Sequence, residues 1–316
     1  MIEIRRYEPK YQKMWNSFIK HSKNGTFLFD RNYMDYHSDR FKDSSVLVFE
    51  NNSLMAVFPA NIEDNIIYSH NGLTYGGLVI HESIGAKKTI DFLNEVIQFY
   101  KGNGIVKIYY KAIPFIYHKI YNQNDSYALF RLSFKLYRRD ISSVINLKQF
   151  NIKGKKLNNY KRALKLGFLL KEVNDCKDII GMYNEQLKKK YHTVAVHTAE
   201  EMNLLKKRVK KNILFFNLEL KNEIVGGVIV YIINHCVHLQ YVIANEYARK
   251  LNGTDFLIVE LYNRFKNNYI WLSYGISTEN NGRFLNESLI KAKEEFNMQG
   301  IVHDFYELKI DMGGGK

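Results

Sequence analysis

Hydrophobic residues in the first half of the chain recur at helical spacing in some stretches and form short apolar runs in others. The positions of Trp15, Phe18 and Ile19 predict a helix over residues 9–21, and a second amphipathic stretch predicts a helix over 84–101. Short apolar runs bounded by turn residues predict strands. These runs cover residues 46–49, 54–60, 66–68 and 105–110.

The second half of the chain repeats this alternation of helices and strands. Helices are predicted over residues 157–166, 178–190, 198–211, 254–266 and 283–293. Strands are predicted over residues 168–173, 213–220, 224–233, 236–243 and 270–272. Because both halves show a helix, a strand hairpin and further helices and strands, we predict an α/β protein of the mixed-sheet, α+β kind. Its two domains would comprise residues 1–145 and 146–316.

The composition fits two globular domains and excludes several other classes. A chain of 316 residues is long enough for two domains, and its 46% of hydrophobic residues excludes wholesale disorder. No apolar run approaches the roughly 20 residues of a membrane span, and the N-terminus has no run like that of a signal peptide. Cys176 and Cys236 do not make a disulfide framework or a metal-type spacing. We therefore expect a cytoplasmic protein without a bound metal.

Positive charge is concentrated in one part of the chain. The formal net charge is +14, and residues 151–211 contain 16 Lys and Arg against 6 Asp and Glu. Such a segment attracts polyanions, which include nucleic acid, the phosphates of a nucleotide and an anionic membrane. The alternative is that lysine-rich helices only present solvated faces, and the sequence leaves both interpretations open.

Two longer runs of sequence are distinctive. They are residues 69–77 (SHNGLTYGG) and residues 275–290 (GISTENNGRFLNESLI). Together with shorter matches at 37–41, 111–114, 196–198 and 239–241, they resemble a bacterial group of the GNAT superfamily. This group is related to the FemAB peptidoglycan-bridge transferases, and its members often accompany surface-polysaccharide biosynthesis. The resemblance extends over about residues 3 to 309.

The resemblance implies two tandem GNAT-like domains with a cleft between them. It implies an acyltransferase that moves an acyl group, usually acetyl, from acyl-CoA to an amine, here on an amino sugar of a nucleotide- or lipid-linked polysaccharide precursor. In the FemAB relatives the donor is aminoacyl-tRNA, so tRNA-dependent aminoacyl transfer is the first alternative. A non-catalytic binding protein is the second, because a fold does not fix a function. Peripheral contact with a membrane stays open.

The resemblance places a donor-binding loop between the strand at 236–243 and the helix from 254. Free N–H groups at a helix start bind anions, and Lys250, Gly253 and Thr254 would contact acetyl-CoA or another acyl-CoA there. Asp255 stands where a second glycine is common, and a carboxylate in this position opposes a phosphate. The alternative is a capped helix after a polar loop.

Amine acylation is helped by a base that takes a proton from the attacking amine and by donors for the developing oxyanion. The candidates for the base are Glu279, His197, His70 and Asp304. Glu279 and His197 lie in predicted loops, where sites are frequent, and His70 precedes a glycine-rich turn. For each candidate the alternative is a structural side chain in a loop, a helix cap, a turn or a strand edge.

Further residues are candidates for substrate contacts. They are Tyr75, Lys111, Gln240, Tyr241, Ser277 and Asn286. Gln240 lies in an apolar strand, where it either lines a cleft or is a satisfied core amide. Lys111 ends a strand and would meet an anionic acceptor, or else extend along the surface. Ser273 stands where the resembling group often has an acid, and Ser288 where it tends to have a glycine.

Overall fold

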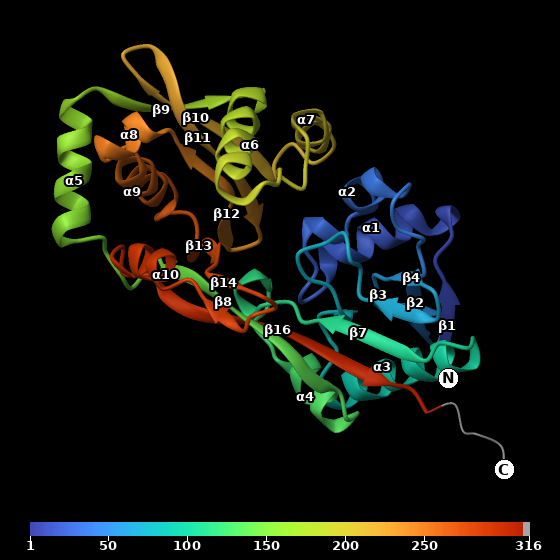
Figure 1. Cartoon of the computed structure of the whole chain (residues 1–316). Helices are drawn as coiled ribbons and strands as arrows, with labels where there is room; N and C mark the ends of the chain where they lie inside the picture. Colours follow the sequence, from blue (N-terminus) through green and yellow to red (C-terminus); the bar gives the residue numbers. More distant parts are fainter. Residues whose placement is uncertain (312–316) are drawn as a thin grey trace. The chain divides into compact units, whose positions relative to one another are not determined.

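The computed structural model describes residues 1–311, except for the side chain of Tyr191, and this part divides into two compact units (Figure 1). Each unit has a hydrophobic core of its own. Residues 312–316 lie outside the described part. Unit 1 comprises Met1–Asp140, Asn280–Phe284 and the described residues from Val302 onward, and unit 2 comprises Ile141–Glu279 and Leu285–Ile301.

The strands of unit 1 are ordered β1-β2-β3-β6 in one sheet and β4-β5-β7-β16-β8 in a second series. β5 and β7 are parallel, whereas β7 and β16 are antiparallel. β8 and β16 each continue into unit 2. The strands are β1 (Ile2–Arg6), β2 (Val46–Glu50), β3 (Ser53–Phe58), β4 (Asn61–Glu63), β5 (Ile66–Tyr68), β6 (Val79–Ile80), β7 (Lys107–Lys111), β8 (Lys135–Asn146) and β16 (Gln299–Lys309).

The β2–β3 hairpin and helix α3 show how the sequence builds unit 1. The turn residues Asn51 and Asn52 have φ angles of 49° and 66°, which asparagine tolerates and two-residue hairpins prefer. α3 (Ala86–Gly102) packs an apolar side with Phe92 and Val96 into the core. Other helices are η1 (Pro9–Tyr11), α1 (Gln12–His21), η2 (Phe27–Phe29), α2 (Arg31–Met34), η3 (Asp35–His37), η4 (Phe115–Tyr117) and α4 (Asn124–Arg131).

In unit 2 the strands are ordered β8-β13-β12-β11-β10-β9. β12 and β13 are parallel, and the other neighbours in this series pair antiparallel. The parallel pairing is short and joins 236–238 to 271–273. The strands are β9 (Phe168–Val173), β10 (Ile213–Leu220), β11 (Glu223–Ile233), β12 (Cys236–Ala244), β13 (Trp271–Ile276), β14 (Thr278–Glu279) and β15 (Phe284–Leu285).

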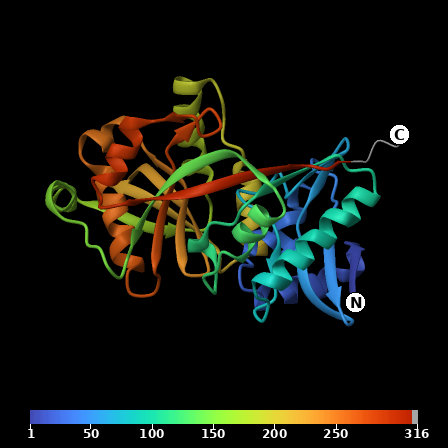
Figure 2. The same cartoon turned by 90° about the horizontal axis from the view of Figure 1, so that it is seen from below.

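Helices cover both faces of the unit 2 sheet (Figure 1 and Figure 2). Since successive strand residues point to opposite faces, Val228 and Val230 pack in the core with α9, while Gly227 and Tyr231 contact α6 and α7. α5 lies against α9 on the first face. The helices are α5 (Gly154–Lys165), α6 (Lys177–Tyr191), α7 (Ala199–Arg208), α8 (Glu246–Lys250), α9 (Gly253–Phe265) and α10 (Glu287–Glu294).

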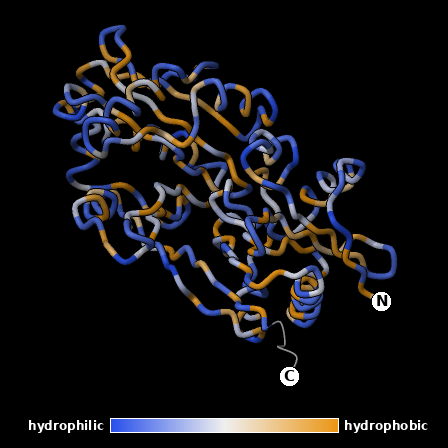
Figure 3. The backbone as a smooth tube through the Cα atoms, turned by 45° about the vertical axis from the view of Figure 1, so that its right-hand side comes forward, coloured by the Kyte–Doolittle hydropathy of each residue, from blue (hydrophilic) through white to orange (hydrophobic). Residues whose placement is uncertain are grey.

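Hydropathy follows this arrangement of layers. The hydrophobic colour gathers along the inner strands, and the hydrophilic colour follows outer loops and the outward sides of helices (Figure 3). The mixed α/β architecture predicted from the hydrophobic pattern is therefore confirmed. Within residues 1–311, no helix combines the length and the apolar character needed to cross a bilayer.

β8 is the longest strand that the hydrophobic pattern does not predict. Its sequence carries charged residues in succession, and these interrupt any apolar alternation. In the fold the charges are paired. Arg138 lies 2.7 Å from Asp140, and Arg139 lies 2.6 Å from Asp304 on β16. The pairing of these charges lets a polar segment serve as a sheet strand.

The last helix begins later than its apolar spacing predicts. The expected start is residue 283, whereas α10 starts at Glu287. The side chain of Asn286 accepts a hydrogen bond from the N–H of Leu289 at 3.0 Å, and this cap fixes the helix start. Phe284 and Leu285, which precede the cap, form the short strand β15 instead.

The C-terminal strand belongs mostly to unit 1, whereas the predicted domains 1–145 and 146–316 place it in the second domain. β16 pairs with β7, with Phe305 opposite Lys111 and Leu308 opposite Ile108. The described residues from Val302 to Asp311 therefore pack in unit 1. The functional division of the chain at residue 145 stays a prediction.

Buried histidines make the free energy of unfolding sensitive to acid. Burial lowers the pKa of both His118 and His303 to about 4. The unfolded chain binds a proton near pH 6.5, so the stability is fully present above that pH and is lost as the pH falls toward about 4. Each histidine contributes a slope of up to about 1.4 kcal/mol per pH unit in this window.

We expect the urea midpoint of the protein to fall between pH 7.5 and pH 5. Burial raises the pKa of Asp125 to about 6, which works in the opposite direction, so the test compares the wild type with His303→Gln. The variant removes one protonation site and should have a smaller pH-dependent loss. Equal losses in the two proteins would contradict the assignment to His303.

Candidate functional site

One lysine, Lys111 at the end of β7, binds the backbone of the loop of residues 69–77 in unit 1. The ammonium of Lys111 donates to three backbone carbonyls of the loop at 2.8, 3.0 and 3.3 Å. Its N–H donates to Ser69 Oγ at 2.8 Å, and its carbonyl accepts from the N–H of Gly76 at 2.9 Å. Burial lowers the pKa of Lys111 to about 7, and the charge of Arg138 adds to the effect. The predicted contact of Lys111 with an anionic acceptor stays a prediction.

His70 is the second residue of this loop, and its ring stacks on that of a second histidine. Its ring lies 5.3 Å from that of His37, between centroids, and the Nε2 of His37 lies 3.2 Å from the carbonyl oxygen of Gly72. Burial lowers the pKa of His70 well below its usual range, helped by the charges of His37, Lys111 and Arg31. Its Nδ1 is buried without a hydrogen-bond partner. The ring is thus a neutral, enclosed part of the loop, and the role of His70 as a base stays a prediction.

The other candidates of unit 1 have structural partners. The hydroxyl of Tyr75 donates to Thr26 Oγ1 at 3.1 Å, and its ring stacks on that of Tyr117 at 5.0 Å. The carboxylate of Asp304 accepts hydrogen bonds from the guanidinium of Arg139 at 2.6 and 2.8 Å. The roles predicted for Tyr75 and Asp304 stay predictions.

A lysine also holds the start of the second distinctive run, in unit 2. The buried ammonium of Lys293 donates to the carbonyls of Gly275 and Ile276 at 2.9 and 2.8 Å. Burial lowers its pKa to about 8. Gly275 has a φ of 71°, a conformation that favours glycine. In each of the two runs that carry the family resemblance, backbone carbonyls therefore converge on one lysine.

The predicted residues of this run form a small network. The amide nitrogen of Asn286 donates to Glu279 Oε1 at 2.9 Å, and the amide oxygen caps α10. The carboxylate of Glu279 is exposed. Ser277 is buried, and its N–H donates to the carbonyl of Ile141 at 2.9 Å. The network explains how the loop keeps its shape, and the catalytic and binding roles of these residues stay predictions.

A bulge in β12 sets the direction of Tyr241. Leu239 lies opposite Val230 and Tyr241 lies opposite Ile229, so Gln240 is an extra residue in this strand. Leu239 packs in the core with α9. Without the bulge, Tyr241 would point to the same face as Leu239. The extra residue turns Tyr241 to the face that α6 covers.

Tyr241 forms a buried pair with His197 on that face. The hydroxyl of Tyr241 lies 2.7 Å from the Nδ1 of His197, and the ring of Tyr183 on α6 packs at 5.0 Å from that of Tyr241. His197 is positioned by the capping box of Thr198 and Glu201 that starts α7. The structure thus joins a predicted base to a predicted substrate contact across 44 residues of sequence.

A second polar pair lies where β12 meets β13, and the sequence analysis did not assign it. His238 Nδ1 lies 3.1 Å from Ser273 Oγ, and both side chains are buried. The two residues are partners in the parallel register. A histidine inside an apolar strand was the available signal. Within residues 1–311, no group of three or more His, Cys, Asp and Glu side chains is placed to hold a metal ion.

The predicted donor residues lie around the junction of α8 and α9. Lys250 forms an exposed ion pair with Glu246 at 2.8 Å. A Cβ at Gly253 would lie 2.9 Å from the carbonyl oxygen of Ala248 and from the ring of Phe168, so close packing alone requires a glycine. Thr254 follows in the first turn of α9 and is partly exposed. Donor contacts by Lys250, Gly253 and Thr254 stay predictions.

Asp255 does not present a free negative charge at the start of α9. Its side chain is buried and accepts hydrogen bonds from Lys156 Nζ at 3.0 Å and from Asn159 Nδ2 at 2.7 Å. Both partners lie on α5, so the acid ties α5 to α9. The opposition that we expected between this acid and a phosphate is offset by the charge of Lys156.

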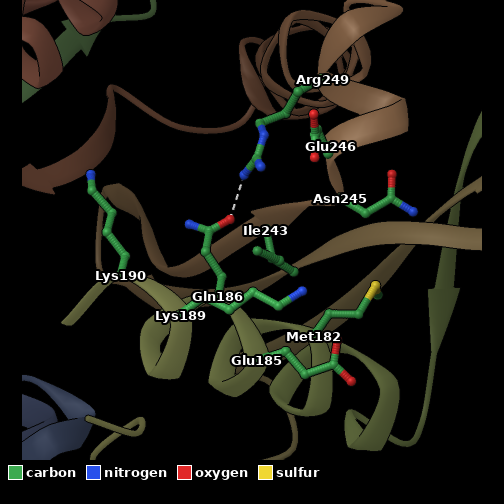
Figure 4. A pocket seen from close by; sticks show the side chains of 9 residues that line it. All are labelled: Met182, Glu185, Gln186, Lys189, Lys190, Ile243, Asn245, Glu246 and Arg249. Atoms are coloured by element: carbon green, nitrogen blue, oxygen red, sulfur yellow. Dashed lines mark hydrogen bonds between the residues drawn. The ribbon is translucent and has the colours of Figure 1, made fainter. Parts of the chain in front are cut away.

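A pocket of about 500 Å³ lies between α6 and the residues that follow β12 (Figure 4). The guanidinium of Arg249 donates to the side-chain oxygen of Gln186 (Figure 4). Ile243 lines the pocket two residues after Tyr241, and Met182 lines it next to Tyr183. β12 and α6 therefore carry both lining residues of the pocket and the packed rings of Tyr241 and Tyr183. Its remaining lining residues are Glu185, Lys189, Lys190, Asn245 and Glu246.

Comparisons with known proteins define the class of fold. No family model matches the chain, and no curated protein sequence does. Solved structures match it over nearly its whole length, and they show a tandem GNAT fold of the FemAB-like kind. The resemblance based on residues 69–77 and 275–290 is thereby confirmed at the level of the fold.

Three solved structures illustrate the likeness. FemX has a TM-score of 0.70 and 8% identity, over 98% of this chain and 97% of its own. L-PGS from Bacillus licheniformis has a TM-score of 0.63 and 12% identity, over 96% and 92%. A tandem GNAT protein from the clavulanic acid biosynthesis pathway has a TM-score of 0.55 and 8% identity, over 100% of both chains. At these identities the likeness shows the fold alone.

Proposed function

We propose that the protein is an acyltransferase that moves an acyl group, usually acetyl, from acyl-CoA to an amine. The acceptor we propose is an amino sugar of a nucleotide- or lipid-linked polysaccharide precursor in the cytoplasm. The observation that carries the proposal is the buried contact of His197 with Tyr241 on β12, the strand whose residue Ile243 lines the pocket. Support comes from the fold shared with FemX, an aminoacyl transferase, and with a tandem GNAT protein.

The pair can move the protons that this reaction requires. The amine nitrogen forms a bond to the thioester carbon, the bond from that carbon to sulfur breaks, and the thiolate leaves. With a proton on Nδ1, His197 donates to the oxygen of Tyr241, and its Nε2 takes the proton of the amine. The hydroxyl proton of Tyr241 goes to the thiolate and is replaced from Nδ1. The amine thus loses one proton and the leaving group gains one.

The pocket supplies positive charge for the phosphates of a donor. Lys189, Lys190 and Arg249 line it beside the carboxylates of Glu185 and Glu246, and Glu246 is also paired with Lys250. A diphosphate held by these side chains would place the rest of an acyl-CoA along β12, toward Tyr241. Holding the two substrates together in this way supplies much of the rate in acyl transfer.

Calorimetry with acetyl-CoA tests the donor site directly. We expect micromolar binding that weakens about tenfold in Lys189→Ala, because a charge-assisted contact to phosphate is lost. Lys188→Ala is the matched control, since Lys188 lies next to it on α6, is exposed and is not a lining residue. The control should change affinity by less than about twofold. Free CoA is measured in parallel to show what the acyl group adds.

Transfer from aminoacyl-tRNA is the second candidate function. It is supported by the likeness to FemX and to L-PGS, a lysyl-phosphatidylglycerol synthetase, and by the basic segment 151–211. A tRNA complex held by many phosphate contacts would weaken steeply with salt. Binding of tRNA with no heat from acetyl-CoA at either of two salt concentrations would replace the first proposal by this one. If neither ligand binds, the non-catalytic alternative, motivated by Asp255 and Ser273, gains support.

A further inference from the structure

The corner where α5 turns into β9 carries exposed leucines. Leu164, Leu166 and Leu169 are 49%, 47% and 61% exposed, and all three fall within six residues of sequence. Gly167 makes the turn between the helix and the strand with a φ of 90°. Phe168, in contrast, is fully buried. Single exposed leucines are ordinary on a protein surface, but three at one corner form a patch.

Positive charge surrounds this corner. Residues 151–171 contain no Asp or Glu. Lys161, Arg162 and Lys165 are exposed beside the leucines, and Lys155 continues the same exposed surface toward the start of α5. We call these four cations and the three leucines the α5 surface. Figure 1 shows α5 at the outer edge of its unit, with α9 on its inner side.

The rest of α5 is already engaged with the fold, which separates the α5 surface from the packed side of the helix. Asn159 and Ala163 are buried, and Lys156 forms ion pairs with Asp255 at 3.0 Å and Glu295 at 3.1 Å. The neighbouring acid on β9, Glu172, is paired with Arg264. The cations of the α5 surface are therefore not offset by the acids of the strand that follows it.

We infer that the α5 surface docks on a bilayer that contains anionic lipid. Lysine and arginine next to an anionic bilayer attract it, each contributing about a fivefold gain in partition. The leucines would enter the boundary between headgroups and acyl chains, where apolar side chains are stabilised. A nucleic acid would be attracted by the same cations, but its phosphates offer nothing to three protruding leucines. The inference stands independently of the proposed function.

Vesicle sedimentation of the full chain tests the inference. Vesicles of equal parts phosphatidylglycerol and phosphatidylcholine should bind the wild type at least thirtyfold better than vesicles of phosphatidylcholine alone. Replacing all three leucines by serine should weaken partition about thirtyfold. Replacing Lys161, Arg162 and Lys165 by glutamine should weaken it about a hundredfold. Because all six side chains are exposed, the variants should keep the urea midpoint of the wild type.

A matched control distinguishes a local surface from the net charge of the protein. Lys207, Lys210 and Lys211 form another exposed basic group, outside α5. Replacing them by glutamine removes the same charge and should change partition by less than about threefold. Equal losses in the two charge variants, or wild-type binding by the leucine variant, would overturn the inference. Binding of tRNA together with no binding to anionic vesicles would also overturn it.

Discussion

Gly76→Ala should lower the free energy of unfolding by at least about 3 kcal/mol. A Cβ at Gly76 would lie 1.8 Å from the backbone oxygen of Ser69 and 2.8 Å from its Oγ. The closest of these atoms is backbone, so no side-chain rotation can relieve the clash. The N–H of Gly76 also donates to the carbonyl of Lys111 at 2.9 Å. A shift of the loop would therefore break the contacts that hold it on β7.

Urea denaturation followed by circular dichroism measures this loss. Gly181→Ala is the matched control, because Gly181 lies inside α6 and is exposed, and an added Cβ there would meet no neighbouring atom within 4 Å. Alanine is the better helix former, so this control should gain about 0.5–1 kcal/mol. An unchanged midpoint in Gly76→Ala would mean that the close approach of residues 69 and 76 is not essential to unit 1.

His197→Ala should lower kcat/KM for acyl transfer by about a hundredfold or more, which is the usual contribution of a positioned base. Tyr241→Phe keeps the ring that packs against Tyr183 and removes the hydroxyl, so it should cost about tenfold to a hundredfold. Since the two groups act as one relay, the double variant should lose little more than His197→Ala. The assay is acetyl-CoA-dependent acetylation of a panel of amino-sugar nucleotides, followed by mass spectrometry.

Two further measurements separate a catalytic pair from a structural one. Added imidazole should restore part of the activity of His197→Ala, because it supplies the missing base, whereas it cannot repair a packing defect. His192→Asn changes an exposed histidine with a φ of 52°, a conformation that asparagine accepts. This control should keep wild-type activity. Full activity in both Tyr241→Phe and His197→Ala would remove the pair from the mechanism.

The hydrophobic pattern predicted most helices and strands, because the apolar residues that each element buries are close together in its own sequence. β9 and β10 begin and end at the predicted residues, since each is an apolar run between clear turn residues. β8 could not be found in this way, because its consecutive charged residues interrupt the apolar pattern. These charges are compensated by Asp140 within the strand and by Asp304 on the distant strand β16. Pairing between distant residues leaves no periodic signal in a single sequence.

The candidate site shows the same limit more strongly. His197 and Tyr241 could each be selected by residue type and position, but their contact depends on one extra residue, Gln240, in β12. A bulge of this kind changes no composition and no hydrophobic fraction. The roles of Lys111 and Lys293, which bind backbone carbonyls of the two distinctive runs, are likewise not visible in the sequence. Lys293 resembles an ordinary helical lysine until the carbonyls of Gly275 and Ile276 are seen around it.

The path of the chain restricts how this gene can exchange parts with its relatives. The backbone passes between the two units at four places, after Asp140, Glu279, Phe284 and Ile301. A single recombination event near residue 140 would inherit unit 1 without the β16 segment that pairs with β7. A crossover near residue 280 would separate the loop at Gly275 from the lysine that holds it. We therefore expect recombination to yield a folded protein when the whole coding region is transferred, and not when only one half is.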